Sequence, residues 1–300
     1  MPSQAWLAQR FLIIPMKKSI NIWSFPGDWD FKRKLSVARE AGFEGFEPEL
    51  AESGPIHLGS SADELAAAKM LVENYGLALS GLATGLYWGA NAASDDPTTR
   101  QRAAEILHRQ IELAAALGID TVLVVPGAVG VDFIPNAEIV PYDSAYERAR
   151  AFIQNALPAA ERHRVCIGIE NVWNKFLLSP LEMRDFIDSF HSEWVGCYLD
   201  VGNALATGYP EHWIRILGQR IKRIHFKDYR RAVGSVSGFV DLLSGDIRWP
   251  EVMRELRAIG YTGWIAAEMI PPVPFYKHSP ETLIQNTARA MEAIFSIADQ

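Results

Sequence analysis

Hydrophobic and polar positions along the 300-residue chain follow two alternating periods. Short runs of apolar and β-branched residues are typical of buried strands, and the segments between them repeat their apolar residues every three or four positions, as amphipathic helices do. This alternation predicts parallel strands joined by helical crossovers. The strand-like runs are 19–25, 42–49, 77–84, 120–127, 165–171, 195–202, 221–228 and 263–269.

The clearest helical segments are 62–76, 97–118, 144–163 and 249–260. Several of the expected helices end in a glycine, which is the common residue at a helix C-terminus. The glycines expected in this role are Gly42, Gly76, Gly118 and Gly260.

Eight strands with about eight helices predict an α/β protein that forms a single-domain (β/α)8 barrel, or TIM barrel. A doubly wound open sheet is the alternative, but no G-x-G-x-x-G or phosphate-binding loop motif follows any of the strands. We expect the barrel to occupy residues 16–300. Residues 1–15 precede Met16, which opens the natural-looking start "MKKSINIWSF", and we expect them to be a poorly ordered extension.

The composition narrows the function classes. Hydrophobic residues make up 49% of the chain, the net charge is -7, and basic residues are scattered apart from "KRIHFKDYRR", so no nucleic-acid partner is expected. No uncharged apolar stretch reaches the ~18 residues of a membrane span. The N-terminus has its apolar residues before its lysines, the reverse of a secretory signal. We expect a cytoplasmic protein in which Cys166 and Cys197 are buried, reduced thiols.

Four consecutive expected strands end in side chains that bind metals: Glu170, Asp200, His225 and Glu268. The carboxyl ends of barrel strands meet at one face, so we expect these side chains to converge. Three converging carboxylates repel one another unless a cation lies between them. This oxygen and nitrogen ligand set favours one Mn²⁺ per chain, with Mg²⁺ or Co²⁺ as alternatives and Zn²⁺ less favoured. Taken alone, Asp200 also fits a helix cap and His225 a hydrogen-bonded core residue.

These residues and their surroundings resemble the xylose isomerase-like barrel group of sugar and sugar-phosphate isomerases and epimerases. The resemblance covers residues 17–297 and is carried by "GFEGFEPEL", "IGIEN", "YLDVGNALATG", "IKRIHFKDYR" and the run from "GFVDLLSGDIRW" to "GWIAAE". It implies that Glu170, Asp200, His225 and Glu268 are the metal ligands. It also implies that Glu170 and Glu268 are the catalytic acid and base.

"DVGNALA" and "HFKD" look most like the L-xylulose- and L-ribulose-5-phosphate 3-epimerases. Free ketose 3-epimerases usually have a His where this chain has Asn203 and a Glu where it has Phe176, whereas their Arg is matched by Arg231. The resemblance therefore implies 3-epimerisation of a ketose, either a ketopentose phosphate or a free ketose. The reaction would pass through a metal-stabilised cis-enediolate. An aldose–ketose isomerase and a keto-inositol dehydratase fit the same site.

Further residues are expected to bind the substrate: Arg231, Lys227, Glu49, Asn203, Trp173 and Trp88. Glu47 and Glu49 end the second run, and we expect one of them inside the barrel, with Glu49 as the contact to a substrate hydroxyl. Lys227 and Arg231 suit a phosphate or hydroxyl group, or form a solvated basic cluster. Trp23, Trp88 and Trp173 suit stacking on a sugar or ordinary core packing. The glycine-rich loop after the seventh run is expected to be a lid.

Two functions of other classes compete. A related barrel group cuts DNA at abasic sites, but the net charge and the lack of further ligands at the third and fourth strand ends disfavour it. A non-catalytic sugar-binding barrel or subunit would lack an essential carboxylate, and all four ligands are present here. The expected partner is a small sugar or sugar phosphate, with a homo-oligomer also possible for this group.

Overall fold

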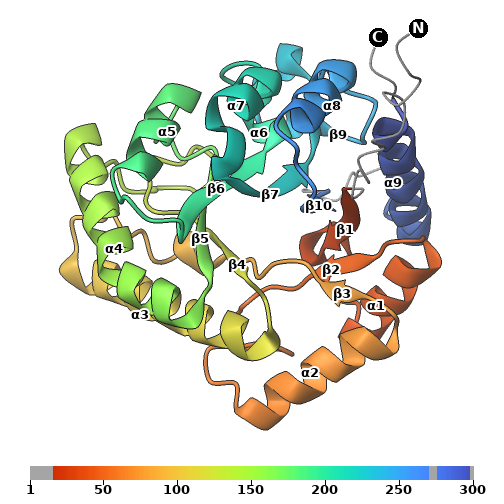
Figure 1. Ribbon diagram of the computed structural model, residues 1–300, viewed down its shortest axis with the longest axis horizontal. Helices are drawn as coiled ribbons and strands as arrows, with labels where there is room; N and C mark the ends of the chain where they lie inside the picture. Colours follow the sequence, from red (N-terminus) through yellow and green to blue (C-terminus); the bar gives the residue numbers. More distant parts are fainter. Residues whose placement is uncertain (1–15, 270–275, 298–300) are drawn as a thin grey trace, which may run out of the picture.

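The computed structural model describes residues 16–269 and 276–297, so the predicted extension 1–15 lies outside the described residues. Eight parallel strands form one sheet in the order β3-β2-β1-β10-β7-β6-β5-β4, with helices around the outside (Figure 1). The strands are β1 Lys17–Asn21, β2 Gly45–Glu47, β3 Ala78–Leu79, β4 Thr121–Val124, β5 Cys166–Glu170, β6 Val195–Asp200, β7 Ile221–Phe226 and β10 Trp264–Ala267.

The two edges of this sheet meet each other. Leu82, just after β3, pairs in parallel with Val122 of β4, and the Leu123 N–H donates to the Leu82 carbonyl at 3.0 Å. This contact satisfies backbone groups that an open edge would leave unpaired. The predicted single-domain (β/α)8 barrel is therefore confirmed.

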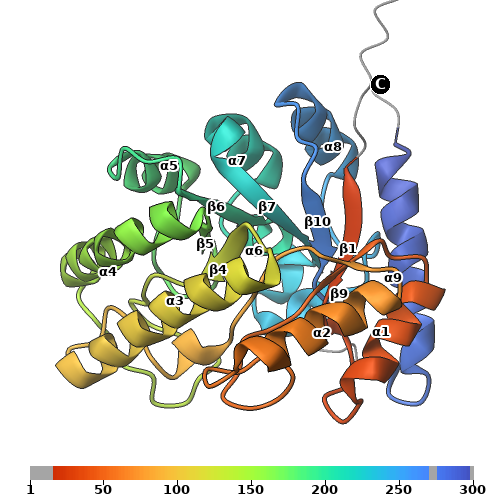
Figure 2. The same cartoon turned by 60° about the horizontal axis from the view of Figure 1, so that its bottom comes forward.

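Helices cover the outer face of the barrel (Figure 2). The four clearest predicted helices are confirmed, and the glycines expected at helix ends, Gly42, Gly76, Gly118 and Gly260, all have positive φ. Helix α2 begins with a capping box between Ser61 and Glu64. The helices are α1 Phe31–Glu40, α2 Ala62–Asn74, α3 Pro97–Leu117, α4 Tyr142–His163, α5 Pro180–Asp188, α6 Val201–Leu205, α7 Pro210–Leu217, α8 Trp249–Ala258 and α9 Pro280–Phe295.

The core lies in the barrel and between the barrel and its helices. Every residue of β4, β5 and β6 is buried, as expected for parallel strands covered on both faces. Cys166 and Cys197 are free and buried, which confirms the prediction for both thiols. Within the described residues, none of the helices is long and apolar enough to cross a membrane.

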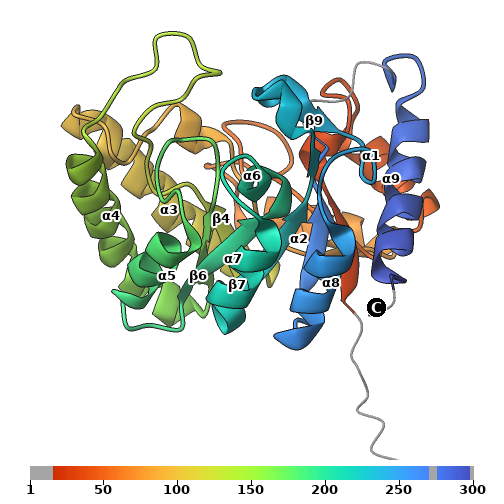
Figure 3. The ribbon, with the colours of Figure 1, turned by 90° about the horizontal axis from the view of Figure 1, so that it is seen from above.

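The loop after β7 carries a small hairpin of its own. Strands β8 (Asp228–Tyr229) and β9 (Phe239–Val240) pair antiparallel, and Figure 3 shows β9 at the end of the barrel where the long loops gather. The buried Asp228 carboxylate accepts hydrogen bonds from the Ile247 N–H at 3.2 Å and from Trp249 Nε1 at 3.2 Å. These bonds join the start of the loop to its end.

Candidate functional site

The four predicted metal ligands lie together at the carboxyl ends of four adjacent strands. Glu170 and Asp200 are the last residues of β5 and β6, His225 lies in β7, and Glu268 directly follows β10. Each offers a ligand atom, and these atoms all lie within 4.8 Å of one another. The sheet order β10-β7-β6-β5 produces this convergence, because neighbouring parallel strands end side by side.

The cluster fits a divalent cation. All four residues are at least nine-tenths buried, so three carboxylates share a small volume with little water. Oxygen Oδ2 of Asp200 is buried without a hydrogen bond, although Lys227 Nζ lies 3.1 Å away. A buried carboxylate oxygen without a hydrogen bond is costly, and a set of carboxylate oxygens with one imidazole nitrogen is a common ligand set for Mn²⁺ and related ions.

The two glutamates of the cluster have different acidities in the metal-free protein. Burial raises the pKa of Glu170 to about 7, and the charge of Glu268 adds to this rise. Burial also acts on Glu268, but the charges of Lys227 and His225 outweigh it and lower its pKa to about 2. For His225, burial lowers the pKa, yet the carboxylates of Glu47 and Glu268 prevail and hold it well above its ordinary value.

His225 lies between the carboxylates of the cluster and Glu47, which was not among the predicted site residues. Its Nδ1 lies 3.0 Å from Glu268 Oε2 and 3.4 Å from Glu170 Oε1, whereas its Nε2 lies 2.7 Å from Glu47 Oε2. Glu47 is fully buried at the end of β2. The only local signal for Glu47 was an acid at the end of a buried strand, the same signal that marks the four ligands.

The contact of Glu49 with a substrate hydroxyl stays a prediction, and the structure brings Glu47 rather than Glu49 to His225. Glu47 points to His225, while Glu49 Oε2 accepts a hydrogen bond from Trp23 Nε1 at 2.5 Å and does not line the cavity at the cluster. Strand β2 ends at Glu47, and beyond Pro48 the residue Glu49 forms an isolated parallel bridge with Ala83.

Two asparagines hold the segments that carry the ligands. Asp200 is the N-cap of α6, and its Oδ1 accepts the Asn203 N–H at 2.7 Å, so the helix-cap role considered for this residue is confirmed and its role as a metal ligand stays a prediction. The Asn203 Nδ2 donates to the Asn171 carbonyl at 3.0 Å. Asn203 also lines the cavity, which is compatible with the predicted substrate contact.

A cavity of about 540 Å³ opens onto the cluster. Glu170, Glu268 and Lys227 lie in its wall, and Lys227 Nζ is 2.5 Å from Glu268 Oε2. The three tryptophans singled out in the sequence also line it: Trp23, Trp88 and Trp173. Val236 and Phe239 of the loop after β7 complete part of the wall, which agrees with the expected lid position.

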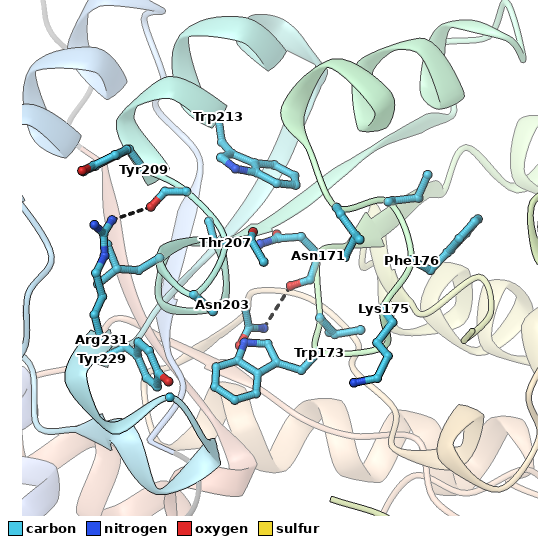
Figure 4. A pocket seen from close by; sticks show the side chains of 18 of the residues that line it. Asn171, Trp173, Lys175, Phe176, Asn203, Thr207, Tyr209, Trp213, Tyr229 and Arg231 are labelled. Carbon is cyan, nitrogen blue, oxygen red and sulfur yellow. Dashed lines mark hydrogen bonds between the residues drawn. The ribbon is translucent and has the colours of Figure 1, made fainter. Parts of the chain in front are cut away.

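Arg231 lies elsewhere, in a second cavity of about 510 Å³ that shares Val172, Trp173 and Asn203 with the first (Figure 4). Its Nη2 donates to the Gly208 carbonyl at 2.5 Å, and its guanidinium lies 4.3 Å from the ring centre of Tyr209. Of these two cavities, Arg231 lines the second and Lys227 the first, and a joint contact of the two residues with a phosphate stays a prediction.

The barrel fold and a cluster that could hold a metal ion at the ends of its strands are the features to compare with known proteins. A family model described as xylose isomerase-like TIM barrel matches residues 35–294. The chain belongs to the xylose isomerase-like TIM barrel family, which confirms the resemblance found in the sequence.

Similar proteins are sugar epimerases. "Putative L-ribulose-5-phosphate 3-epimerase SgbU" of Escherichia coli (strain K12) is 25% identical over 256 residues, covering 81% of this chain and 84% of that protein. A D-psicose 3-epimerase from Clostridium cellulolyticum H10, solved with D-tagatose, has a TM-score of 0.78 at 17% identity and covers 94% of this chain and 99% of its own.

A third similar structure, the IOLI protein with a bound zinc atom, has a TM-score of 0.74 at 17% identity and covers 95% of this chain and 100% of its own. At these identities the two structural likenesses establish the fold, and the family match places the chain among proteins that include sugar epimerases.

Proposed function

We propose that this protein is a divalent-metal-dependent sugar or sugar-phosphate isomerase whose reaction is the 3-epimerisation of a ketose. The observation that carries the proposal is the buried cluster of Glu170, Asp200, His225 and Glu268 at the wall of a cavity of about 540 Å³. The sugar epimerases among the similar proteins support the same reaction class.

All four residues of the cluster would hold the ion, with Mn²⁺ as the proposed metal. When bound, the ion would stabilise negative charge that develops on the sugar oxygens as a proton leaves the neighbouring carbon. Because a similar structure carries zinc, Zn²⁺ belongs in any metal comparison.

Glu170 and Glu268 would carry out the proton transfers. They come from β5 and from the end of β10, on either side of the strands that carry Asp200 and His225, and both line the cavity. One carboxylate would remove the proton at C3 and the other would return a proton to the opposite face. Lys227 and Asn203 would bind substrate oxygens. The three tryptophans that line the cavity, Trp23, Trp88 and Trp173, would pack against the apolar face of the sugar.

The test is a substrate screen in D₂O with the Mn²⁺-loaded protein. Ketopentoses, ketohexoses, their phosphates and a keto-inositol are incubated, and the sugars are followed by NMR for deuterium at C3. Exchange at C3 with a new epimer supports the proposal, exchange at C1 or C2 with an aldose product identifies an aldose–ketose isomerase, and loss of water from a keto-inositol identifies a dehydratase. No turnover of any of these compounds with Mn²⁺ or Zn²⁺ would contradict an enzyme of this class.

Variants make the assignment of the two glutamates testable. Glu170→Gln and Glu268→Gln should each lower kcat by about 10²- to 10⁴-fold, because an amide cannot accept the proton. Glu73→Gln, on the exposed face of α2, is the matched control and should turn over like the wild type. The cytoplasmic location, the lack of a nucleic-acid partner and a homo-oligomer stay predictions.

A further inference from the structure

The two ring nitrogens of His225 have different surroundings. Nδ1 faces the carboxylates of Glu170 and Glu268, and Nε2 points away from them to Glu47 Oε2 at 2.7 Å. A histidine ligates a metal through the lone pair of one nitrogen, and the hydrogen bond made by the other nitrogen decides which one is available.

The hydrogen bonds around Glu47 settle the direction of this bond. The Asn21 carbonyl oxygen Oδ1 accepts the Trp23 N–H at 2.8 Å, so its Nδ2 is the atom that faces Glu47. Asn21 Nδ2 donates to Glu47 Oε2 at 2.6 Å. An ionised carboxylate oxygen only accepts hydrogen bonds, and Oε2 already accepts one from Asn21, so His225 Nε2 is the donor in the second bond.

We propose that Glu47, oriented by Asn21, is a positioning residue that keeps a proton on His225 Nε2 and thereby makes Nδ1 the metal-binding atom. The inference deepens the proposed function, because it takes the cluster to be a metal site. It assigns a role to Glu47, although this carboxylate does not line the cavity at the cluster.

Packing keeps this arrangement in place. Asn21, Glu47 and His225 are all fully buried, and the ring of Tyr198 packs edge-on against the imidazole at 4.9 Å between ring centres. Gly81 leaves the room that Glu47 needs, since a Cβ there would lie 2.7 Å from Glu47 Oε1. The imidazole and the carboxylate are thus enclosed by neighbouring side chains, and the bond between them holds the ring orientation.

The first test measures Mn²⁺ affinity by calorimetry. Glu47→Gln keeps the shape of the side chain and removes its charge, and we expect the affinity to fall about 10- to 100-fold, the usual size of such outer-ligand effects. Glu44→Gln, an exposed acid just before β2, is the matched control and should bind like the wild type. An affinity of Glu47→Gln within twofold of the wild type would overturn the inference.

The second test needs no substitution, so it stands even if Glu47→Gln does not fold. In the diamagnetic Zn²⁺-loaded wild type, ¹⁵N NMR of His225 should show a protected proton on Nε2 and a metal-bound Nδ1. A proton on Nδ1 would overturn the inference. A wild type that binds neither Mn²⁺ nor Zn²⁺ would overturn the proposed function and this inference with it, whereas Mn²⁺ binding that is insensitive to Glu47→Gln overturns the inference alone.

Discussion

The side chain of Asn171 forms two hydrogen bonds with the backbone of Asp200, one in each direction. Asn171 Nδ2 donates to the Asp200 carbonyl at 2.8 Å, and the Asp200 N–H donates to Asn171 Oδ1 at 2.8 Å. Both residues are at least nine-tenths buried. The Asn171 side chain thus joins the end of β6 to the end of β5. These two strand ends carry the predicted metal ligands Asp200 and Glu170.

Asn171→Asp should weaken this junction. A carboxylate cannot donate to the Asp200 carbonyl and adds negative charge beside two acids, so we expect the free energy of unfolding to fall by about 1–3 kcal/mol. Urea unfolding of the metal-free protein measures the change. Asn155→Asp on the exposed face of α4 is the control, with an expected change within about 0.5 kcal/mol. Equal stability of Asn171→Asp and the wild type would show that the paired bonds are dispensable.

Lys227→Met should strengthen metal binding while it impairs turnover. The ammonium lies 3.1 Å from Asp200 Oδ2 and 2.5 Å from Glu268 Oε2, so its charge opposes a divalent cation held by the same oxygens. We expect Mn²⁺ to bind roughly tenfold more tightly to the variant, as measured by calorimetry. Lys227→Arg keeps the charge and should not show this gain. Weaker Mn²⁺ binding by Lys227→Met would instead mean that the lysine supports the site.

Gly202→Ala tests the close approach of α6 to the end of β7. A Cβ at Gly202 would lie 2.4 Å from the Lys227 Cβ and 3.1 Å from its carbonyl carbon, and neither atom can move without the backbone. We expect the free energy of unfolding to fall by about 1–3 kcal/mol. Gly27→Ala is the control, because no atom lies within 4 Å of a Cβ there. Chemical denaturation compares the two, and equal losses would contradict the steric explanation.

Asp188→Asn should destabilise the protein at neutral pH and not at low pH. Hydrogen bonds from Arg220, at 2.6 and 2.7 Å, and the charge of its guanidinium lower the pKa of Asp188. A carboxylate with a lowered pKa adds stability above its unfolded pKa of about 3.9, and this stability is lost as the pH falls through the folded pKa.

Because both side chains of this pair are partly exposed, the effect at pH 7 should stay within about 1 kcal/mol. Urea unfolding of wild type and Asp188→Asn at pH 7 and pH 3 provides the measurement. A stability difference of the same size at both pH values would show that the loss comes from packing rather than from charge.

The fold and the clustering of the four expected metal ligands were predictable because they depend on local signals. The spacing of apolar residues, the length of each strand and the glycine at a helix end can all be recognised within a single segment. In a barrel the carboxyl ends of β5, β6, β7 and β10 then lie at one face. An acid or histidine at the end of a buried strand is therefore informative before any contact is known.

Other features of the site depend on contacts between distant segments. The partners of Glu47 and Glu49 are His225 and Trp23 from other strands and loops, and the position of Arg231 depended on the path of the loop after β7. The partner of His225 lies on a strand far away in the sequence and comes close only because the barrel closes around its interior.

The sequence by itself thus determined the repeating strand–helix units and the chemistry at their ends, since both are properties of consecutive residues. Only the tertiary structure decided which ring nitrogen of His225 faces the cluster and which glutamate forms a hydrogen bond with the other ring nitrogen. It also decided which side chains line the same cavity. The physical reason is that hydrogen-bond direction and cavity shape are set by atoms from several strands at once.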